Sequence, residues 1–348
     1  MDYARLKDGA ADAITDALAG RVSGIAVDTS GSTGTPAEVL LPGRALRASA
    51  GATAARLGGD GHWVLALPTD RIAGAMVVVR AALGGTALAS VSPGSFTADA
   101  FVAAAQRLPS EGRRYTSLVP TQLRRVMADA GARDALASFD AVLVGGAALG
   151  MEDVPAPVVR TYGMTETAGG CVYDGRPIGD TSVRVREDGR ILIATSALAD
   201  GYRPERPDVW EIHEERRWLV TADLGEWDGE GALRVLGRAD HVITTGGLKV
   251  HPRMVEQAVD QLDWVHESAV VGAPSAEWGE AVVSFVVPRD RERTERLWDF
   301  RAALEPHLPG YALPRELVVV AALPRLPSGK VNYPLLKSLA ADLGRNAT

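Results

Sequence analysis

Short apolar runs alternate with longer stretches of helical periodicity through the first half of the chain. Strand-like runs fall at residues 24–28, 62–67, 116–119, 141–144 and 157–161, and helical patterns fall at 72–83, 97–107 and 121–130. This alternation predicts a largely parallel sheet covered by helices. Because the ligands of such sheets bind beyond the carboxyl ends of the strands, we expect the functional residues in the loops that follow the strands.

The pattern changes near residue 189, where short strands with turn signals replace the strand and helix alternation. Residues 228–231, Asp-Gly-Glu-Gly, predict the tip of a hairpin. Helical patterns at 252–262 and 294–304 and strand-like runs at 268–271, 282–287 and 316–323 then indicate a smaller α+β domain. We therefore expect an α/β protein with a large N-terminal domain over residues 1–237 and a small C-terminal domain over residues 238–348.

Composition excludes several classes of protein. The 348 residues carry 37 Lys and Arg against 44 Asp and Glu, for a formal net charge of -7, and 46% of them are hydrophobic. This length and apolar content are enough for two cores. The acidic balance argues against nucleic-acid partners and anionic membranes. The apolar runs fall far short of the roughly 20 residues that a membrane-spanning helix needs, so we expect no membrane insertion.

Other features indicate a compartment. The first eight residues mix both signs of charge and lead into no apolar core of a secretory signal. Cys171 has no second cysteine for a disulfide or a thiolate metal cluster, and no base is evident beside it, so we expect it to pack. The six histidines show no metal-ligand spacing. We expect a cytoplasmic protein.

The first segment with chemical character follows the strand-like run at 24–28. It reads Asp28-Thr-Ser-Gly-Ser-Thr-Gly-Thr-Pro36. Hydroxyl side chains and glycines directly after a strand allow backbone N–H groups to surround phosphate oxygens. The segment does not match the P-loop pattern, and by itself a surface turn explains it equally well.

Further polar segments follow along the chain. Residues 161–167, Thr-Tyr-Gly-Met-Thr-Glu-Thr, place a hydroxyl beside a carboxylate, a combination that can bind phosphate and Mg²⁺, near a tyrosine that offers a flat face to a base. The carboxylate of residues 221–225 and the arginine of residues 236–240 suit the hydroxyls of a ribose. Residues 245–252 form a glycine-rich turn that enters a helix, and residues 327–330, Pro-Ser-Gly-Lys, present one lysine.

In combination these segments resemble the adenylate-forming superfamily of acyl-CoA ligases, acyl-adenylating enzymes and luciferases. The resemblance covers nearly the whole chain and rests on motifs in the superfamily's order: 29–36, 162–166, 221–225, Gly237-Arg238 with Asp240, and Gly329-Lys330. Within the superfamily the chain most resembles the o-succinylbenzoate-CoA ligases of menaquinone biosynthesis. That narrower likeness uses residues 115–124, 161–175 and 245–252 and the short length of the chain.

The resemblance implies an activity and its cofactors. Members activate a carboxylic acid with Mg-ATP, release pyrophosphate to form an acyl-adenylate, and then transfer the acyl group to a thiol, commonly that of CoA, with release of AMP. The partners implied are thus a small carboxylic acid, ATP, Mg²⁺ and CoA. The small C-terminal domain is mobile in the superfamily and rotates between the two half-reactions, with Asp240 at the hinge position.

The resemblance also assigns roles to individual residues. Lys330 is expected to bridge the α-phosphate and the carboxylate during adenylation, Thr165 to contact the α-phosphate, and Glu166 to bind Mg²⁺. The residues expected to bind the nucleotide are Thr29, Ser30, Gly31, Ser32, Thr33, Gly34, Gly145, Gly146, Tyr162, Gly163, Met164, Asp223 and Arg238. Those expected near the acid are Arg71, Ser117 and Gly170, and those expected near CoA are Gly246, Gly247 and Lys249.

Two positions depart from the family pattern. Ala37 stands where members usually carry a lysine that assists the pyrophosphate end of ATP, so we expect weaker use of ATP. Arg71 stands where the related ligases typically have histidine. Two interpretations of Arg71 stay open: it pairs with a second carboxylate of the substrate, or it makes a structural salt bridge near Asp70.

Alternative functions also stay open. One is adenylation of another aryl or acyl acid, with CoA or a carrier protein as the acceptor, which Arg71 favours. Another is a nucleotide-binding protein with weakened catalysis, which Ala37 favours. The presence of Lys330, Glu166, Asp223 and Arg238 argues for catalysis, because binding alone requires no adenylation lysine. A monomer and a homodimer are equally compatible with the sequence.

Overall fold

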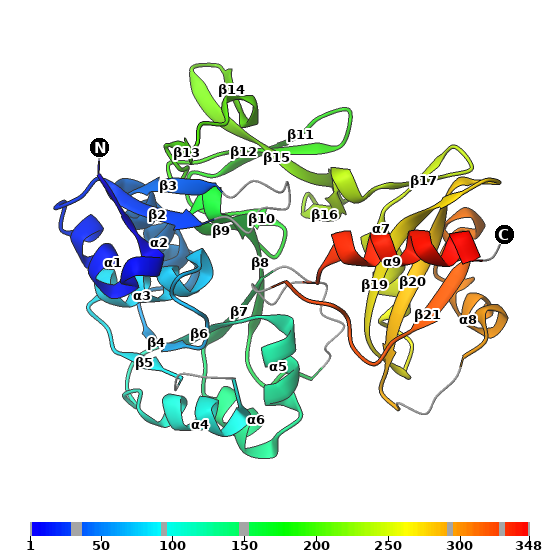
Figure 1. Cartoon of the computed structure of the whole chain (residues 1–348). Helices are drawn as coiled ribbons and strands as arrows, with labels where there is room; N and C mark the ends of the chain where they lie inside the picture. Colours follow the sequence, from blue (N-terminus) through cyan, green and yellow to red (C-terminus); the bar gives the residue numbers. More distant parts are fainter. Residues whose placement is uncertain are drawn as a thin grey trace. The chain divides into compact units, whose positions relative to one another are not determined.

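A computed structural model describes residues 2–28, 37–91, 96–145, 153–290, 295–326 and 331–346 (Figure 1). The chain divides into two compact units. The large unit comprises Met1–Arg186, Ile191–Thr221 and Trp227–Leu233, and the small unit comprises Glu187–Arg190, Ala222–Glu226 and Arg234–Thr348. The protein is thus a mixed α/β protein with a large N-terminal part and a smaller C-terminal part, as the sequence predicts.

A seven-stranded sheet forms the centre of the large unit, with the order β10-β9-β8-β7-β6-β4-β5. Its strands are β4 (His62–Leu65), β5 (Leu88–Ser90), β6 (Arg114–Leu118), β7 (Ala141–Gly145), β8 (Val158–Met164), β9 (Gly169–Tyr173) and β10 (Arg176–Pro177). The strands from β5 to β8 run parallel, and β9 and β10 add antiparallel pairs. The predicted largely parallel sheet is confirmed.

Helices cover both faces of this sheet. They are α2 (Gly43–Leu57) and α3 (Ile72–Gly84) on one face, and α4 (Ala98–Gln106), α5 (Pro120–Met127) and α6 (Ala130–Leu136) on the other. Side chains of β4 alternate between the two cores: Val64 packs with α4 to α6, and Trp63 and Leu65 pack with α2 and α3. This alternation is the period of two that a strand imposes. It explains why consecutive residues of β4, from Trp63 to Leu65, are apolar.

A second sheet of the large unit departs from the sequence-based expectation. Its order is β1-β2-β3-β13. The strands are β1 (Tyr3–Arg5), β2 (Gly24–Asp28), β3 (Glu38–Pro42) and β13 (Gly201–Arg203), and α1 (Ala10–Leu18) packs against them. The run at 24–28 therefore does not join the parallel sheet, because it pairs antiparallel with β3, a strand that the sequence analysis missed.

A third sheet has the order β11-β12-β15-β14, with β16 paired to β15. Its strands are β11 (Ser182–Val185), β12 (Arg190–Ala194), β14 (Trp210–His213), β15 (Arg216–Trp227) and β16 (Leu233–Arg238). The predicted hairpin tip lies between β15 and β16, where Asp228 N donates to Ala232 O at 2.9 Å and Gly231 adopts a φ of 73°. A glycine suits this left-handed conformation.

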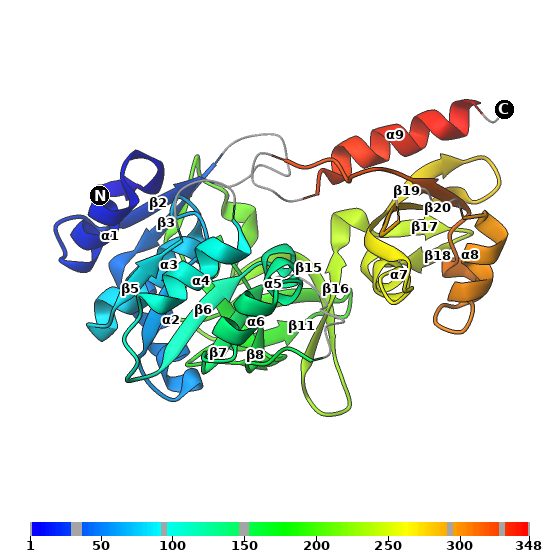
Figure 2. The same ribbon diagram turned by 90° about the horizontal axis from the view of Figure 1, so that it is seen from below.

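The small unit contains a sheet of order β18-β17-β20-β19, with β21 parallel to β20. Its elements are β17 (Ile243–Thr245), β18 (Leu248–Val250), α7 (Pro252–Val259), β19 (Val265–Ser275), β20 (Gly279–Pro288), α8 (Leu297–Leu304), β21 (Glu316–Val319) and α9 (Tyr333–Asn346). Helices α7 and α8 pack on one face and α9 packs on the other (Figure 2). Helix α9 was not predicted from the sequence.

The described residues also contain short 3-10 helices: η1 (Leu6–Asp8), η2 (Thr165–Thr167), η3 (Pro207–Val209), η4 (Ala239–His241) and η5 (Gly310–Ala312).

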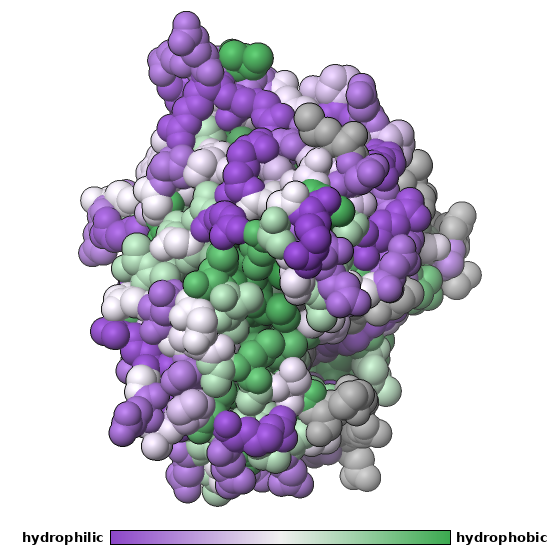
Figure 3. Space-filling view, turned by 90° about the vertical axis from the view of Figure 1, so that its left-hand side faces the viewer, coloured by the Kyte–Doolittle hydropathy of each residue, from purple (hydrophilic) through white to green (hydrophobic). Residues whose placement is uncertain are grey.

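One face of the large unit carries a band of apolar residues between polar margins (Figure 3). Exposed apolar side chains of this unit include Leu83 in α3 and Leu88 in the edge strand β5, each 38% exposed. None of the helices in the described residues is long and apolar enough to span a membrane.

Candidate nucleotide-binding site

The carboxyl ends of β7 and β8 lie side by side in the large unit. Gly145, the last residue of β7, pairs with Thr161 of β8 in parallel register. Among the described residues, a Cβ at Gly145 would meet only Thr161 Oγ1, at the ordinary contact distance of 3.5 Å. The packing of these residues therefore does not require glycine at this exposed position. Gly146 lies outside the described residues.

Strand β8 has an irregularity after Tyr162. The pairing of β8 with β9 shifts register between Tyr162 and Gly163. A Cβ at Gly163 would lie 2.1 Å from Gly169 O, so only glycine fits there. A Cβ at Gly170 would lie 2.9 Å from Tyr173 Cε1, which gives Gly170 a packing reason that involves no substrate. These close approaches set the path of the chain into η2.

The turn of η2 is held by the buried side chain of Thr167. Its Oγ1 accepts from Met164 N at 2.9 Å and donates to Gly169 O at 2.7 Å. Ala168 follows in the left-handed conformation with a φ of 49°, and its carbonyl accepts from Ser49 Oγ at 2.8 Å. Thr165 and Glu166, at the start of the turn, are half-buried. The hydroxyl and the carboxylate therefore project from a fixed backbone.

The Glu166 carboxylate has one partner that the sequence analysis did not foresee. Tyr202 in β13 donates its hydroxyl to Glu166 Oε1 at 2.7 Å, and Ala199 N donates to the backbone carbonyl of Glu166 at 2.8 Å. Burial, followed by the charge of Glu166, raises the pKa of Tyr202, so this hydroxyl stays protonated. No signal in the sequence separates Tyr202 from an ordinary core tyrosine.

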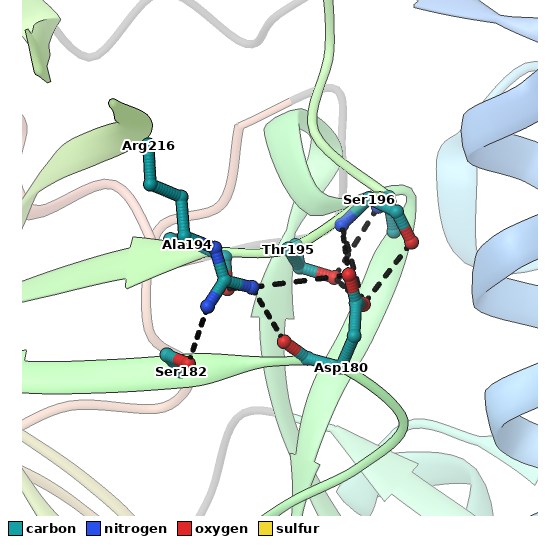
Figure 4. A network of polar contacts seen from close by, with 7 residues as sticks. Asp180, Ser182, Ala194, Thr195, Ser196 and Arg216 are labelled. Carbon is teal, nitrogen blue, oxygen red and sulfur yellow. Dashed lines mark hydrogen bonds and ion pairs between the residues drawn. The ribbon is translucent and has the colours of Figure 1, made fainter. Parts of the chain in front are cut away.

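The turn at Thr195 and Ser196, which precedes Tyr202, is held by hydrogen bonds to Asp180 (Figure 4). Its carboxylate accepts from Thr195 Oγ1 at 3.0 Å, from Ser196 Oγ at 3.1 Å and from Ser196 N at 3.0 Å. Burial alone would raise the pKa of Asp180, but the hydrogen bonds from Ser196 and Thr195 outweigh burial and lower it. Arg216 donates to Asp180 O at 2.6 Å and to Ser182 Oγ at 2.7 Å. These hydrogen bonds therefore hold the residues directly after β12, which precede the contact of Ala199 with Glu166.

The segment rich in Ser, Thr and Gly, with Thr29, Ser30, Gly31, Ser32, Thr33 and Gly34, lies outside the described residues. Its two ends are described. Ala37, after it, is 3% exposed and packs in the same buried cluster as Ala168, which follows η2. Ala37 and Ala168, which follow the two motifs in the sequence, therefore pack in one core although more than a hundred residues separate them. Ala37, at the position of the usual lysine, is itself buried.

Arg71 contacts Asp28, the last described residue before that segment. Its Nη1 donates to Asp28 O at 3.4 Å, and its Nε lies 3.6 Å from Asp70 Oδ2. The salt bridge that one interpretation of Arg71 expected is therefore present, and the other interpretation, pairing with a substrate carboxylate, stays a prediction. Ser117, the third residue predicted near the acid with Arg71 and Gly170, is 7% exposed in β6.

Asp223, Arg238 and Asp240 belong to the small unit. Asp223 lies in β15 and Arg238 ends β16. Arg238 donates to Asp240 through Nε at 2.8 Å and through Nη2 at 2.9 Å. This bidentate pair, with burial opposing it, lowers the pKa of Asp240. The arginine predicted to support a ribose is thus paired with the residue at the predicted hinge.

The glycine-rich turn of the small unit joins β17 to β18. Gly246 and Gly247 have φ values of 56° and 78°. Gly246 N donates to Trp278 O at 2.8 Å, and a Cβ at Gly246 would lie 3.1 Å from Trp278 Cε3. The backbone carbonyl of Trp278 therefore holds the turn, and its indole lies beside Gly246. Lys249 is exposed in β18.

Lys330 lies outside the described residues. The chain on either side of it is described: Arg325 and Val331 form an antiparallel bridge, and Asn332 N donates to Pro324 O at 2.8 Å. In the described residues no group of three or more His, Cys, Asp or Glu side chains is arranged to hold a metal ion.

Two family models match this chain. Residues 29–202 match the model of the AMP-binding enzymes, and residues 254–330 match the model of the AMP-binding enzyme C-terminal domain. The chain belongs to the AMP-binding enzyme family. In this AMP-binding enzyme the first match begins at the segment rich in Ser, Thr and Gly and ends at Tyr202, and the second ends at Lys330.

Two curated relatives of this AMP-binding enzyme are informative. A probable 2-succinylbenzoate-CoA ligase of Mycobacterium tuberculosis is 45% identical over 326 residues, which cover 88% of this chain and 82% of the relative. A sulfoacetate-CoA ligase of Cupriavidus necator is 33% identical over 342 residues, which cover 87% and 64%. Both are named as CoA ligases, but their acids differ.

The fold agrees with a solved structure. The o-succinylbenzoate CoA synthetase (MenE) from Bacillus subtilis, in complex with the acyl-adenylate intermediate OSB-AMP, matches with a TM-score of 0.77 and 24% identity. The match covers 91% of this chain and 69% of that one. At this identity the likeness shows the fold, which is that of the adenylate-forming enzymes.

Proposed function

We propose that this AMP-binding enzyme is an ATP-dependent acid-CoA ligase and that its acid is o-succinylbenzoate, which places it in menaquinone biosynthesis. The activity follows from the family and from two relatives named as CoA ligases. The acid follows from the M. tuberculosis relative, which is 45% identical. The observation in the structure that carries the proposal is the fixed turn of η2, which presents Thr165 and Glu166 beyond the carboxyl end of β8.

The first half-reaction joins the carboxylate to the α-phosphate of ATP. A carboxylate oxygen attacks phosphorus, and pyrophosphate leaves with its bonding electrons. Thr165 contacts the α-phosphate, and Lys330 bridges it to the carboxylate, so that the two anions can meet. Tyr162 lies against adenine, and Asp223 and Arg238 hold the ribose. Gly145 and Gly146 have no side chains, which would leave room for the acyl group and the adenine.

Glu166 fits a role toward Mg²⁺. Tyr202 occupies Oε1, whereas within the described part of the chain Oε2 has no such partner. A carboxylate oxygen beside phosphate is the kind of ligand that Mg²⁺ takes, and the ion would neutralise charge on the phosphates of ATP. The donor set therefore suits Mg-ATP.

In the second half-reaction the CoA thiol attacks the acyl carbonyl and AMP leaves. Lys330 must withdraw, because sulfur needs access to the carbonyl. We assign the boundary between the two domains to residues 237–238 and the hinge to Asp240, with Gly246, Gly247 and Lys249 beside the pantetheine arm and the phosphates of CoA. The reaction uses metabolites of the cytoplasm, and we assign the enzyme to that compartment.

A panel of acids tests this proposal. Pyrophosphate exchange into ATP is measured with o-succinylbenzoate, with benzoate, which lacks the second carboxylate, and with sulfoacetate. CoA thioester formation is then measured for each active acid. We expect exchange and thioester formation with o-succinylbenzoate. Exchange without CoA product would point to a carrier protein as acceptor, and no exchange with any acid would contradict catalysis.

A second acid is a specific alternative, because Arg71 replaces the usual histidine and one relative is named for sulfoacetate. Arg71→Ala separates the two interpretations of this residue. If the guanidinium binds a second acidic group of the substrate, the variant raises KM for o-succinylbenzoate and leaves KM unchanged for 4-oxo-4-phenylbutanoate, which keeps the succinyl carboxylate and lacks the one on the ring. If Arg71 only makes its salt bridge to Asp70, neither KM changes.

A further inference from the structure

The hydrogen bond between Tyr202 and Glu166 joins two segments that are remote in sequence. Tyr202 lies in β13 and is 7% exposed, and its hydroxyl is 2.7 Å from Glu166 Oε1. The backbone link from Ala199 N to Glu166 O, at 2.8 Å, lies three residues earlier in the same segment. The strand and the η2 turn are thus tied both through the backbone and through a side chain.

The direction of this hydrogen bond is determined by chemistry. The Tyr202 hydroxyl is the donor of this hydrogen bond, and Glu166 Oε1 is the acceptor. An ionised carboxylate is only an acceptor. A donor on Oε1 stabilises one orientation of the carboxylate and leaves Oε2 with its lone pairs for a cation.

Tyr202 is itself held by its neighbours. In β13 it pairs with Val39 of β3, its ring lies 6.1 Å from that of Trp210, and the Arg206 guanidinium lies 5.3 Å from its ring centroid. These contacts hold the ring in place. The hydroxyl therefore has little freedom to follow a moving carboxylate.

The segment before Tyr202 is fixed as well. Arg217 Nη1 donates to Asp200 O at 3.0 Å, and Arg217 also donates to Ala199 O. Upstream, Asp180 fastens Thr195 and Ser196, as Figure 4 shows. These hydrogen bonds hold the residues that precede β13. Tyr202 therefore cannot easily shift relative to η2.

We propose that Tyr202 is a positioning residue that fixes Glu166 through Oε1 and so selects Oε2 as the oxygen that meets the cation of the metal-nucleotide complex. The proposal rests on the proposed function, because it assumes that Glu166 faces Mg-ATP. Tyr202 itself touches neither substrate nor metal. Its removal therefore weakens the affinity for the cation, whereas the affinity for the acid is unaffected.

Tyr202→Phe tests the proposal because it removes one oxygen and keeps the ring. Mn²⁺ replaces Mg²⁺ as a paramagnetic probe, and its binding is titrated by electron paramagnetic resonance in the presence of a non-hydrolysable ATP analogue. We expect the Kd of Mn²⁺ to rise about tenfold in the variant. In pyrophosphate exchange, the Mg²⁺ concentration for half-maximal rate should rise by a similar factor, with KM for the acid unchanged.

Tyr115→Phe is the matched control. Tyr115 is a buried tyrosine of the same unit whose hydroxyl donates to Leu57 O at 3.1 Å and to Gly59 O at 3.2 Å. This control should leave Mn²⁺ binding unchanged. An equal effect in both variants, or a Kd in Tyr202→Phe within twofold of the wild type, would overturn the proposal.

The metal titration separates this inference from the proposed function. If no acid supports exchange but wild-type protein binds Mn²⁺ with the ATP analogue and Tyr202→Phe binds it less tightly, the proposed activity fails and the role of Tyr202 stands. If the wild type binds no Mn²⁺ with the analogue, both fail. Thermal unfolding of each variant confirms that the comparison is made on folded protein.

Discussion

Tyr333, the first residue of α9, donates its hydroxyl to Glu256 Oε1 on α7 at 2.8 Å. The same carboxylate oxygen accepts from Val270 N at 3.0 Å, and the Tyr333 ring lies 4.9 Å from that of His241 in η4. Tyr333 comes three residues after Lys330. The residues that follow the lysine motif are therefore held to the small unit by this hydrogen bond and ring contact.

This buried carboxyl predicts a dependence of stability on pH. Burial raises the pKa of Glu256 above its ordinary value of 4.5. Between pH 4.5 and the raised pKa the folded protein holds a proton that the unfolded chain has lost, so the free energy of unfolding falls as pH rises. The difference in this free energy between wild type and Glu256→Gln should therefore decrease as pH rises from about 4.5.

Denaturant unfolding of both proteins at several pH values measures this difference. Glu305→Gln, which changes an exposed carboxyl at the end of α8, is the control and should follow the wild type. Parallel curves for wild type and Glu256→Gln would show that the proton on Glu256 is not linked to folding.

A second prediction concerns the reactivity of Cys171. This thiol is 3% exposed in β9, and burial raises its pKa to about 12. Since only the thiolate attacks disulfides, we expect no reaction of the native protein with an aromatic disulfide reagent at pH 8, and one equivalent of reaction after unfolding. The chain has a single cysteine, so the signal is unambiguous. Rapid labelling of folded protein would contradict the buried position.

A third prediction concerns the glycine that allows the turn into η2. Gly163→Ala places a Cβ 2.1 Å from a backbone oxygen, which cannot move aside as a flexible side chain can. We expect a loss of stability of about 3 kcal/mol, measured by denaturant unfolding. Gly51→Ala in α2 is the control, because nothing lies within 4 Å of the new atom. It should stabilise the helix by about 0.5–1 kcal/mol.

A fourth prediction separates the two half-reactions. Lys330→Ala should abolish pyrophosphate exchange, because the charge that brings carboxylate and α-phosphate together is lost. Thioester formation from supplied acyl-adenylate and CoA should persist, since the lysine has no part in that step. Comparing the two assays on one preparation provides the control for folding. An equal loss in both would contradict this division between the half-reactions.

Local patterns in the sequence were sufficient for much of the fold. The apolar or β-branched runs at 62–67, 116–119 and 141–144 correspond to β4, β6 and β7, because strands buried on both faces are rich in such residues. The hairpin tip at 228–231 was predictable because a left-handed residue favours glycine. The motifs that indicated the adenylate-forming family are likewise contiguous in sequence, so no tertiary contact was needed to find them.

Tertiary structure decided what depends on pairing between remote segments. The run at 24–28 looks like any parallel strand, and only its hydrogen bonds to β3 place it in another sheet. Tyr202 resembles a core tyrosine until the fold brings its hydroxyl to Glu166, 36 residues earlier in the chain. Sequence periodicity records which side chains are buried along one element, whereas the partner of a polar atom depends on how distant elements pack.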